Sequence, residues 1–243
     1  MSEYKLFSGN CLDIIKSFPD NCIDLIATDP PYRIENILGG GSINNAGKMQ
    51  SLKELEKSNL IYGYDIELYC KEFIRVMKDI NIYFWCNKKQ IFDYLKLFIE
   101  KHKCTFNILF WGKTNPIPTY SNKYMSDCEY LLHFRKGKAK CLPKTYDDAR
   151  TYYISSLNSK DKAKYKHPTV KSLDFTRKII RNSSRENQII LDPFMGSGTS
   201  IVAALLEGRN AIGIEINKEY FNIAQKRIEN EAKDLQNLKG MSL

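Results

Sequence analysis

Short apolar runs alternate along the chain with stretches whose apolar residues recur at helical spacing. The apolar runs predict strands at 4–7, 22–28, 80–85, 105–111, 128–134, 188–192 and 211–215. The helical spacing predicts helices at 12–17, 64–78, 88–102, 170–182 and 201–206. Strands that alternate with helices indicate an α/β fold with a doubly wound, mostly parallel sheet.

Two segments interrupt this alternation. Residues 33–63 contain the turn-prone stretches Gly39–Ser42 and Asn44–Gly47. A loop of this length inside a compact domain is usually functional or disordered, so we expect a mobile loop beside the residues that precede it. Residues 112–165 are turn-rich and basic, which predicts an insertion into a domain formed by 1–111 and 166–243.

Composition excludes several classes of protein. Hydrophobic residues make up 43% and charged residues 27%, which is typical of a globular protein, and no apolar run reaches the roughly 20 residues that span a bilayer. The first residues lack a signal-peptide pattern, so we expect a cytoplasmic protein without a membrane partner. Seven cysteines without a C-x-x-C pair argue against disulfides and against a metal site.

The positive charge is concentrated in one segment. The net charge is +9, and residues 101–171 hold 15 Lys and Arg against 5 Asp and Glu. Tyrosines interleave with these cations, and the combination suits phosphates and unstacked bases. A basic segment alone does not distinguish DNA from RNA. The candidate nucleic-acid contacts are Lys113, Asn115, Lys123, Arg135, Lys136, Lys138 and Lys140.

The stretch Asp29-Pro30-Pro31-Tyr32 follows a predicted buried strand. Neither proline has an N–H to donate, whereas the carbonyls of Asp29 and Pro30 remain free acceptors. A carboxylate beside a free carbonyl suits a group with two N–H donors, such as an exocyclic amine, and Tyr32 offers a face for a planar ring. The stretch predicts a pocket for the amino group of a nucleobase, although a plain loop start has the same composition.

A second motif predicts a nucleoside-cofactor site. Residues 188–200 form a strand, a glycine-rich turn and the start of a helix, and the next strand ends in Glu215, which can accept both ribose hydroxyls. A dinucleotide fingerprint would place a third glycine where Ile201 stands. Asp192 would repel a pyrophosphate but attract an ammonium or sulfonium group. The chemistry favours S-adenosylmethionine over NAD, with a nucleotide-dependent dehydrogenase as the alternative.

The two motifs together resemble the amino-methylating DNA methyltransferases with permuted motif order, the β class. Asp29 to Tyr32 are similar to that family's catalytic motif, Asp192 to Thr199 to its methionine-binding motif, and Lys166 to Lys171 to an element that closes over the methionine carboxylate. The last element departs from the family at Val170 and Ser172. The resemblance implies the S-adenosylmethionine-dependent methyltransferase fold, with 112–165 as a target-recognition region.

The same resemblance implies the residues of the site. The catalytic residues would be Asp29, Pro30, Pro31 and Tyr32. The cofactor would be held by Asn10, Cys11, His167, Thr169, Lys171, Asp192, Pro193, Phe194, Gly196, Ser197, Gly198, Thr199, Glu215, Ile216 and Asn217.

The resemblance further implies transfer of a methyl group to the amine of a base flipped out of double-stranded DNA. Asp29 favours adenine N6, because the family's cytosine members more often have Ser at this place. N4-cytosine methylation and a non-catalytic DNA-binding subunit of a modification complex are the alternatives. The family also leaves open a homodimer and a cognate restriction endonuclease as a further partner.

Overall fold

The computed structural model describes residues 2–32, 64–116, 124–156 and 170–240. The predicted mobile loop 33–63 and the predicted site residues Lys123, His167 and Thr169 lie outside the described residues. Within the described part of the chain, no helix is long and apolar enough to cross a bilayer.

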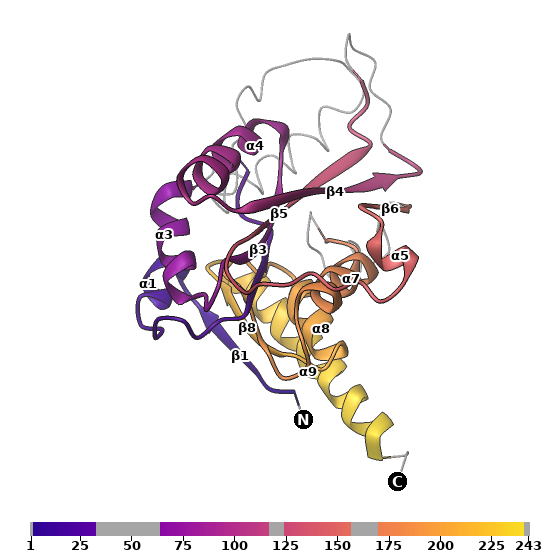
Figure 1. The fold of residues 1–243 in the computed structure, drawn as a ribbon. Helices are drawn as coiled ribbons and strands as arrows, with labels where there is room; N and C mark the ends of the chain where they lie inside the picture. The colour runs from indigo at the N-terminus through magenta and orange to yellow at the C-terminus, as the bar shows by residue number, and fades with distance from the viewer. Residues whose placement is uncertain (1, 33–63, 117–123, 157–169, 241–243) are drawn as a thin grey trace, which may run out of the picture.

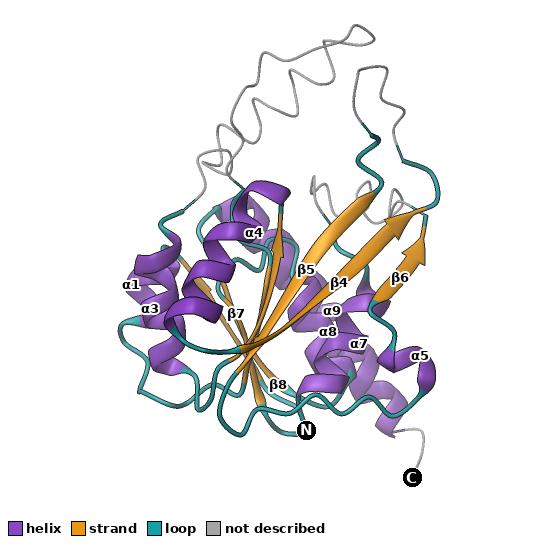
Figure 2. Ribbon diagram, turned by 45° about the horizontal axis from the view of Figure 1, so that its top comes forward, coloured by secondary structure: helices purple, strands orange, loops and turns teal. Residues whose placement is uncertain are grey.

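Eight strands form one sheet in the order β1-β8-β7-β2-β3-β5-β4-β6 (Figure 2). Their bounds are β1 Tyr4–Ser8, β2 Leu25–Thr28, β3 Asn81–Cys86, β4 Thr105–Lys113, β5 Cys128–Arg135, β6 Tyr152–Ser155, β7 Ile189–Asp192 and β8 Asn210–Glu215. Strand β5 is antiparallel to β3 and to β4, and every other pairing in the sheet is parallel. The predicted doubly wound, mostly parallel sheet is therefore confirmed.

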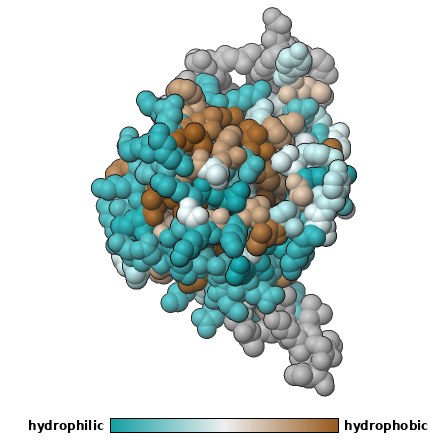
Figure 3. Space-filling model, in the orientation of Figure 1, coloured by the Kyte–Doolittle hydropathy of each residue, from teal (hydrophilic) through white to brown (hydrophobic). Residues whose placement is uncertain are grey.

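Helices cover both faces of the sheet (Figure 1). One face carries α1 (Cys11–Ile15), α3 (Ile66–Val76), α4 (Lys88–Leu95) and a π-helical continuation, η1 (Lys96–Lys101). The other face carries α7 (Leu173–Ser183), α8 (Thr199–Leu206) and α9 (Lys218–Gly240). A short helix, α5 (Tyr146–Ala149), precedes β6. The surface drawn in Figure 3 is largely hydrophilic around an area where apolar residues gather.

Strand β3 shows why the central strands are rich in apolar residues. All six of its residues are buried. Ile82 and Phe84 face the core under α3 and α4, whereas Tyr83 and Trp85 face the core under α7 and α8. Successive side chains of a strand point to opposite faces, so a strand covered by helices on both sides has apolar residues on both of its faces. Asn81 at its start is the polar exception, and its side-chain amide is hydrogen-bonded.

The segment 112–165, predicted as an insertion, contributes to the sheet itself. Strand β5 lies between β3 and β4, and β6 extends the edge beyond β4. The sequence pattern predicts β5 as a strand but not its central place, because pairing partners far apart in the chain leave no local signal. The pattern also does not predict α5, β6 or the C-terminal helix α9.

Candidate active site

The order of the strands reverses direction between β7 and β2. From β7 the chain proceeds to β8, and from β2 it proceeds to β3 on the other side. Ligands of doubly wound folds bind in the crevice at the carboxyl ends of the strands on either side of such a switch point. Asp192 ends β7, Glu215 ends β8, and Asp29 directly follows β2. The fold therefore brings the two predicted motifs to one edge of the sheet.

A cavity of about 300 Å³ lies at this edge. This volume is at the small end of the range typical of ligand pockets. Many of the predicted site residues line it: Asn10, Cys11, Asp29, Pro31, Lys171, Asp192, Pro193, Phe194, Gly196, Ser197, Thr199, Glu215, Ile216 and Asn217. Pro30, Tyr32 and Gly198 are not among the lining residues.

Asp192 organises the turn after β7. Its carboxylate accepts hydrogen bonds from the Thr28 hydroxyl (2.7 Å), the Phe194 amide (3.0 Å) and the Ser200 hydroxyl. Burial raises the pKa of this carboxyl to about 6, although the hydrogen bonds from Ser200 and Thr28 oppose the rise. Asp192 thus connects the end of β2 with the start of α8.

Glu215 is held by the backbone of two turns. Its carboxylate accepts from the amide of Gly196 (2.9 Å) and from the amide of Asn217 (2.8 Å). Burial raises its pKa, and these amide donors oppose the rise. Each carboxylate oxygen retains a lone pair that could accept from a ligand hydroxyl. The Gly9 amide donates to the Glu215 carbonyl at 3.0 Å, so the turn after β1 closes the same wall.

Gly198 supports the site from behind. It caps α8 with φ +80°, and a Cβ added here would lie 3.0 Å from Ile228 Cδ1 and 3.3 Å from Ala224 Cβ. The glycine therefore allows α9 to pack closely on the turn. Gly198 thus packs against α9 and does not line the cavity.

Aromatic rings form another wall of the cavity. Tyr64 and Tyr69 both line it and both pack against Phe194, with ring centroids 5.5 and 6.0 Å apart. The sequence does not mark these tyrosines as site residues, because their helical spacing indicates only core packing. Cys11 lies beside them, and burial raises the pKa of its thiol to about 12, which keeps the thiol neutral.

The residues after β2 form a corner of charged groups. The Asp29 carboxylate accepts from the Tyr32 hydroxyl at 2.6 Å and forms an ion pair with Lys171 at 3.0 Å. Lys171 also contacts Glu129 of β5 at 2.7 Å, and Glu129 contacts Lys113 of β4 at 2.5 Å. Burial raises the pKa of Asp29, whereas Lys171 and Tyr32 lower it.

The sequence pattern does not indicate Glu129, and it predicts Lys171 as a cofactor ligand and Lys113 as a nucleic-acid contact. The register of β5 against β4 places Glu129 opposite Trp111, two residues before Lys113. No local sequence pattern indicates such a pairing, because the pairing depends on which strands become neighbours in the sheet. Elsewhere in this corner, Gln90 donates to the Pro31 carbonyl at 3.1 Å, and among the described residues none donates to the Pro30 carbonyl.

Most of the predicted nucleic-acid contacts lie away from this corner. Arg135 pairs with Asn81 at the start of β3, and Lys136, Lys138 and Lys140 follow it. Strand β5 is antiparallel to its neighbours, so its carboxyl end lies at the amino ends of the parallel strands. Since a strand rises about 3.3 Å per residue, the length of β3 separates this end from the charged corner at Asp29 by about 20 Å. Asn115, by contrast, lies just beyond the carboxyl end of β4.

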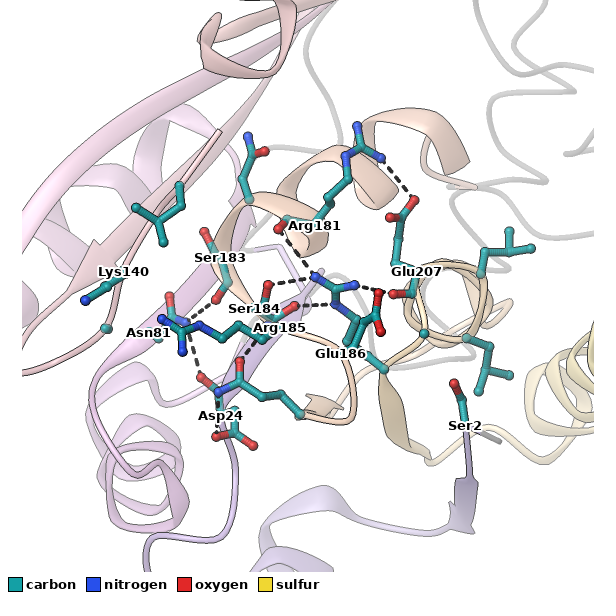
Figure 4. Close-up of a pocket in the computed structure, with 18 of the residues that line it drawn as sticks. Ser2, Asp24, Asn81, Lys140, Arg181, Ser183, Ser184, Arg185, Glu186 and Glu207 are labelled. Atoms are coloured by element: carbon teal, nitrogen blue, oxygen red, sulfur yellow. Dashed lines mark hydrogen bonds and ion pairs between the residues drawn. The ribbon is translucent and has the colours of Figure 1, made fainter. Parts of the chain in front are cut away.

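A second, wider cavity of about 1240 Å³ lies at this opposite edge. Lys138 is among its lining residues, as are Lys140, Asp24, Arg181 and Arg185, which Figure 4 labels. Arg181 is paired with Asp148 at 2.7 Å and with Glu207 at 3.0 Å. The structure therefore does not bring this part of the basic run together with Asp29.

Comparison with known proteins connects the site to an activity. Residues 23–226 match the model of a family described as DNA methylase, of the N6/N4 methyltransferase type. The type II methyltransferase M2.DpnII of Streptococcus pneumoniae is 34% identical over 84% of this chain and 81% of its own length. M2.MboI of Moraxella bovis is 29% identical over 92% of this chain and 87% of its own.

Solved structures have the same fold. The M1.HpyAVI–SAM complex has a TM-score of 0.66 and 29% identity, and the match covers 93% of this chain and 98% of the chain in the complex. The cytosine-N4-specific PvuII DNA methyltransferase has a TM-score of 0.68 at 15% identity, over 98% of this chain and 94% of its own. The resemblance to this family is thereby confirmed, and the chain belongs to the N6/N4 DNA methylase family.

Proposed function

We propose that this DNA methylase transfers the methyl group of S-adenosylmethionine to N6 of an adenine flipped out of double-stranded DNA. The observation that carries the proposal is the position of the Asp29 carboxylate. It borders the same cavity that Glu215 and the turn after β7 line. An acceptor for an amine therefore stands beside a pocket suited to a nucleoside cofactor.

The cavity residues fit the cofactor by their chemistry. The Glu215 carboxylate, held by two backbone amides, suits the two ribose hydroxyls. Asn10, Cys11 and Ile216 provide a wall for the adenine, and the turn containing Ser197 and Thr199 suits the methionine end. Bound S-adenosylmethionine would supply an electrophilic methyl group on a sulfonium.

Asp29 would orient the target amine. One of its oxygens accepts from Tyr32 and the other from Lys171, so each oxygen retains a lone pair for an incoming N–H. The Pro30 carbonyl would accept the second amino hydrogen, which directs the nitrogen lone pair toward the methyl group. Tyr32 would stack on the flipped ring. Positioning of this kind supplies much of the rate in a reaction between two bound partners.

The choice of adenine rests on the residue type at position 29. An Asp here resembles the adenine-specific members of the family. The fold itself does not distinguish the two bases, because the PvuII enzyme, which is cytosine-N4-specific, has the same architecture. Methylation of cytosine N4 is therefore the second candidate. A homodimer and a partner endonuclease stay predictions.

The test is a methylation assay with labelled S-adenosylmethionine and duplex DNA of mixed sequence, followed by digestion and mass spectrometry of the nucleosides. We expect N6-methyladenine from the wild type and none from Asp29→Ala, which should still bind the cofactor. N4-methylcytosine would establish the second candidate. A wild type that binds the cofactor but leaves all DNA unlabelled would instead support a non-catalytic subunit.

A further inference from the structure

The Lys171 ammonium contacts three different acceptors. It donates to a Glu129 oxygen at 2.7 Å and to the Tyr32 hydroxyl at 3.0 Å, and it forms an ion pair with an Asp29 oxygen at 3.0 Å. An ammonium has three N–H bonds, so the number of contacts equals the number of its donors. The cation is therefore fully occupied at the catalytic corner, although its side chain also borders the cofactor cavity.

The surroundings of Lys171 hold it in place. Its side chain is only 8% exposed, and the ammonium lies 4.9 Å from the centre of the Trp85 ring and 5.4 Å from that of Tyr32. Lys113 pairs with the other oxygen of Glu129, so two cations and two carboxylates balance each other. A buried cation of this kind needs such partners, because losing one leaves an uncompensated charge.

We propose that Lys171, anchored by Glu129, is a positioning residue for methyl transfer, which holds Asp29 as an oriented and ionised acceptor and does not bind the cofactor's carboxylate. This inference rests on the proposed function and assigns Lys171 and Glu129 a role in it. Asp29 needs two properties to receive an amine: its oxygens must face the amine, and they must carry no proton. The Lys171 ion pair supplies both.

The electrostatics of Asp29 make the ion pair necessary. Burial raises the pKa of this carboxyl, and Lys171 is the strongest of the groups that lower it. The charged and titratable groups around it are Tyr32, Lys171, Glu129 and, farther out, Lys113, Asp192 and Cys86. Without the Lys171 cation, the Tyr32 hydrogen bond would be left to oppose burial and the charge of Glu129, and protonation of Asp29 would be favoured. A protonated carboxyl presents one acceptor fewer to the amine.

The test compares Lys171→Met and Glu129→Gln with the wild type. Methionine retains the apolar stem of Lys171 and removes the charge, and glutamine retains the shape of Glu129. At saturating cofactor and DNA we expect kcat to fall about 100-fold in Lys171→Met, because a misplaced acceptor costs about this much. The acidic limb of its kcat–pH profile should move to higher pH. The Kd for S-adenosylmethionine, measured by calorimetry, should change less than about threefold.

Two further variants separate positioning from folding. Lys178→Met is the matched control: Lys178 is also buried, and it donates only to the carbonyls of Asp147 and Arg150, away from the site. Its pH profile should match that of the wild type. Lys171→Arg retains a cation and should keep the acidic limb near its wild-type position even where kcat falls. If Lys171→Met does not fold, Lys171→Arg and Glu129→Gln still test the role through the same measurements.

The outcomes distinguish this inference from the proposed function. A wild type that binds the cofactor but methylates no DNA would overturn both. With an active wild type, a tenfold weaker Kd in Lys171→Met and an unchanged kcat at saturation would show a cofactor-binding residue and overturn only this inference. An acidic limb that stays in place in Lys171→Met would also overturn it.

Discussion

The hydroxyl of Thr28 donates to the carboxylate of Asp192 at 2.7 Å, across 164 positions of the chain. Thr28 is the last residue of β2 and immediately precedes Asp29, whereas Asp192 ends β7 and begins the glycine-rich turn. This buried hydrogen bond therefore joins the predicted catalytic motif, which begins at the next residue, to the predicted cofactor motif. It also holds β2 and β7 together on the two sides of the switch point.

Replacing Thr28 by Val should destabilise the protein. Valine has the shape of threonine but leaves one Asp192 oxygen with the Phe194 amide as its only donor. We expect a loss of about 1–3 kcal/mol in the free energy of unfolding, measured with urea at pH 7. Thr28→Ser retains the hydroxyl and is the control. Equal stability of the Val and Ser variants would show that the hydrogen bond contributes little.

The pKa of Asp192 predicts how stability depends on pH. Its pKa is raised to about 6 in the folded state, against about 4 when unfolded, so the folded protein binds the proton more tightly. Below pH 4, protonated Asp192 contributes its full stabilisation, about 3 kcal/mol in the free energy of unfolding. This contribution is lost as the pH rises to 6. Asp192→Asn should remove this pH dependence of the unfolding free energy. The difference in unfolding free energy between the wild type and the Asn variant should therefore change between pH 4 and 7. A constant difference would contradict the assignment.

Gly198 and Gly208 form a matched pair for substitution by alanine. Their φ angles are +80° and +78°, so the backbone strain from a side chain is alike. A Cβ at Gly198 would lie 3.0 Å from Ile228 Cδ1, whereas one at Gly208 would reach no closer than 3.4 Å, to Glu186. Gly198→Ala should therefore cost about 1–3 kcal/mol more than Gly208→Ala. Thermal unfolding of both variants measures this difference, and equal losses would exclude crowding against α9.

The lysines at the amino edge of the sheet should contribute little to binding of short DNA. Lys138 and Lys140 lie beyond the end of β5, about 20 Å from the charged corner at Asp29. The double variant Lys138→Gln, Lys140→Gln should leave the Kd for a short duplex within about twofold at 0.1 M salt. The dependence of log Kd on log salt should also be unchanged. A slope reduced by about 2 would show that both lysines meet phosphates.

The two motifs could be predicted from the chain because their chemistry is local. Two prolines that lack N–H groups follow a buried strand at Asp29, and the turn of Gly196 and Gly198 precedes a helix and a strand that ends in Glu215. Turn residues and apolar periodicity act over a few positions, so they indicate strands, helices and the ends of strands without knowledge of the fold. The parallel sheet and the nucleoside pocket follow from that pattern.

The tertiary structure decided which charges meet. Strand β5 enters the sheet between β3 and β4, which brings Glu129 to Lys171 and takes Arg135 to the opposite edge. A run of basic residues in the sequence does not indicate the direction of a strand. Because β5 is antiparallel to its neighbours, its carboxyl end lies at the edge of the sheet opposite to Asp29. The sequence determined the chemistry available at each strand end. The pairing of distant strands, which depends on packing over the whole core, determined the partners of each charge.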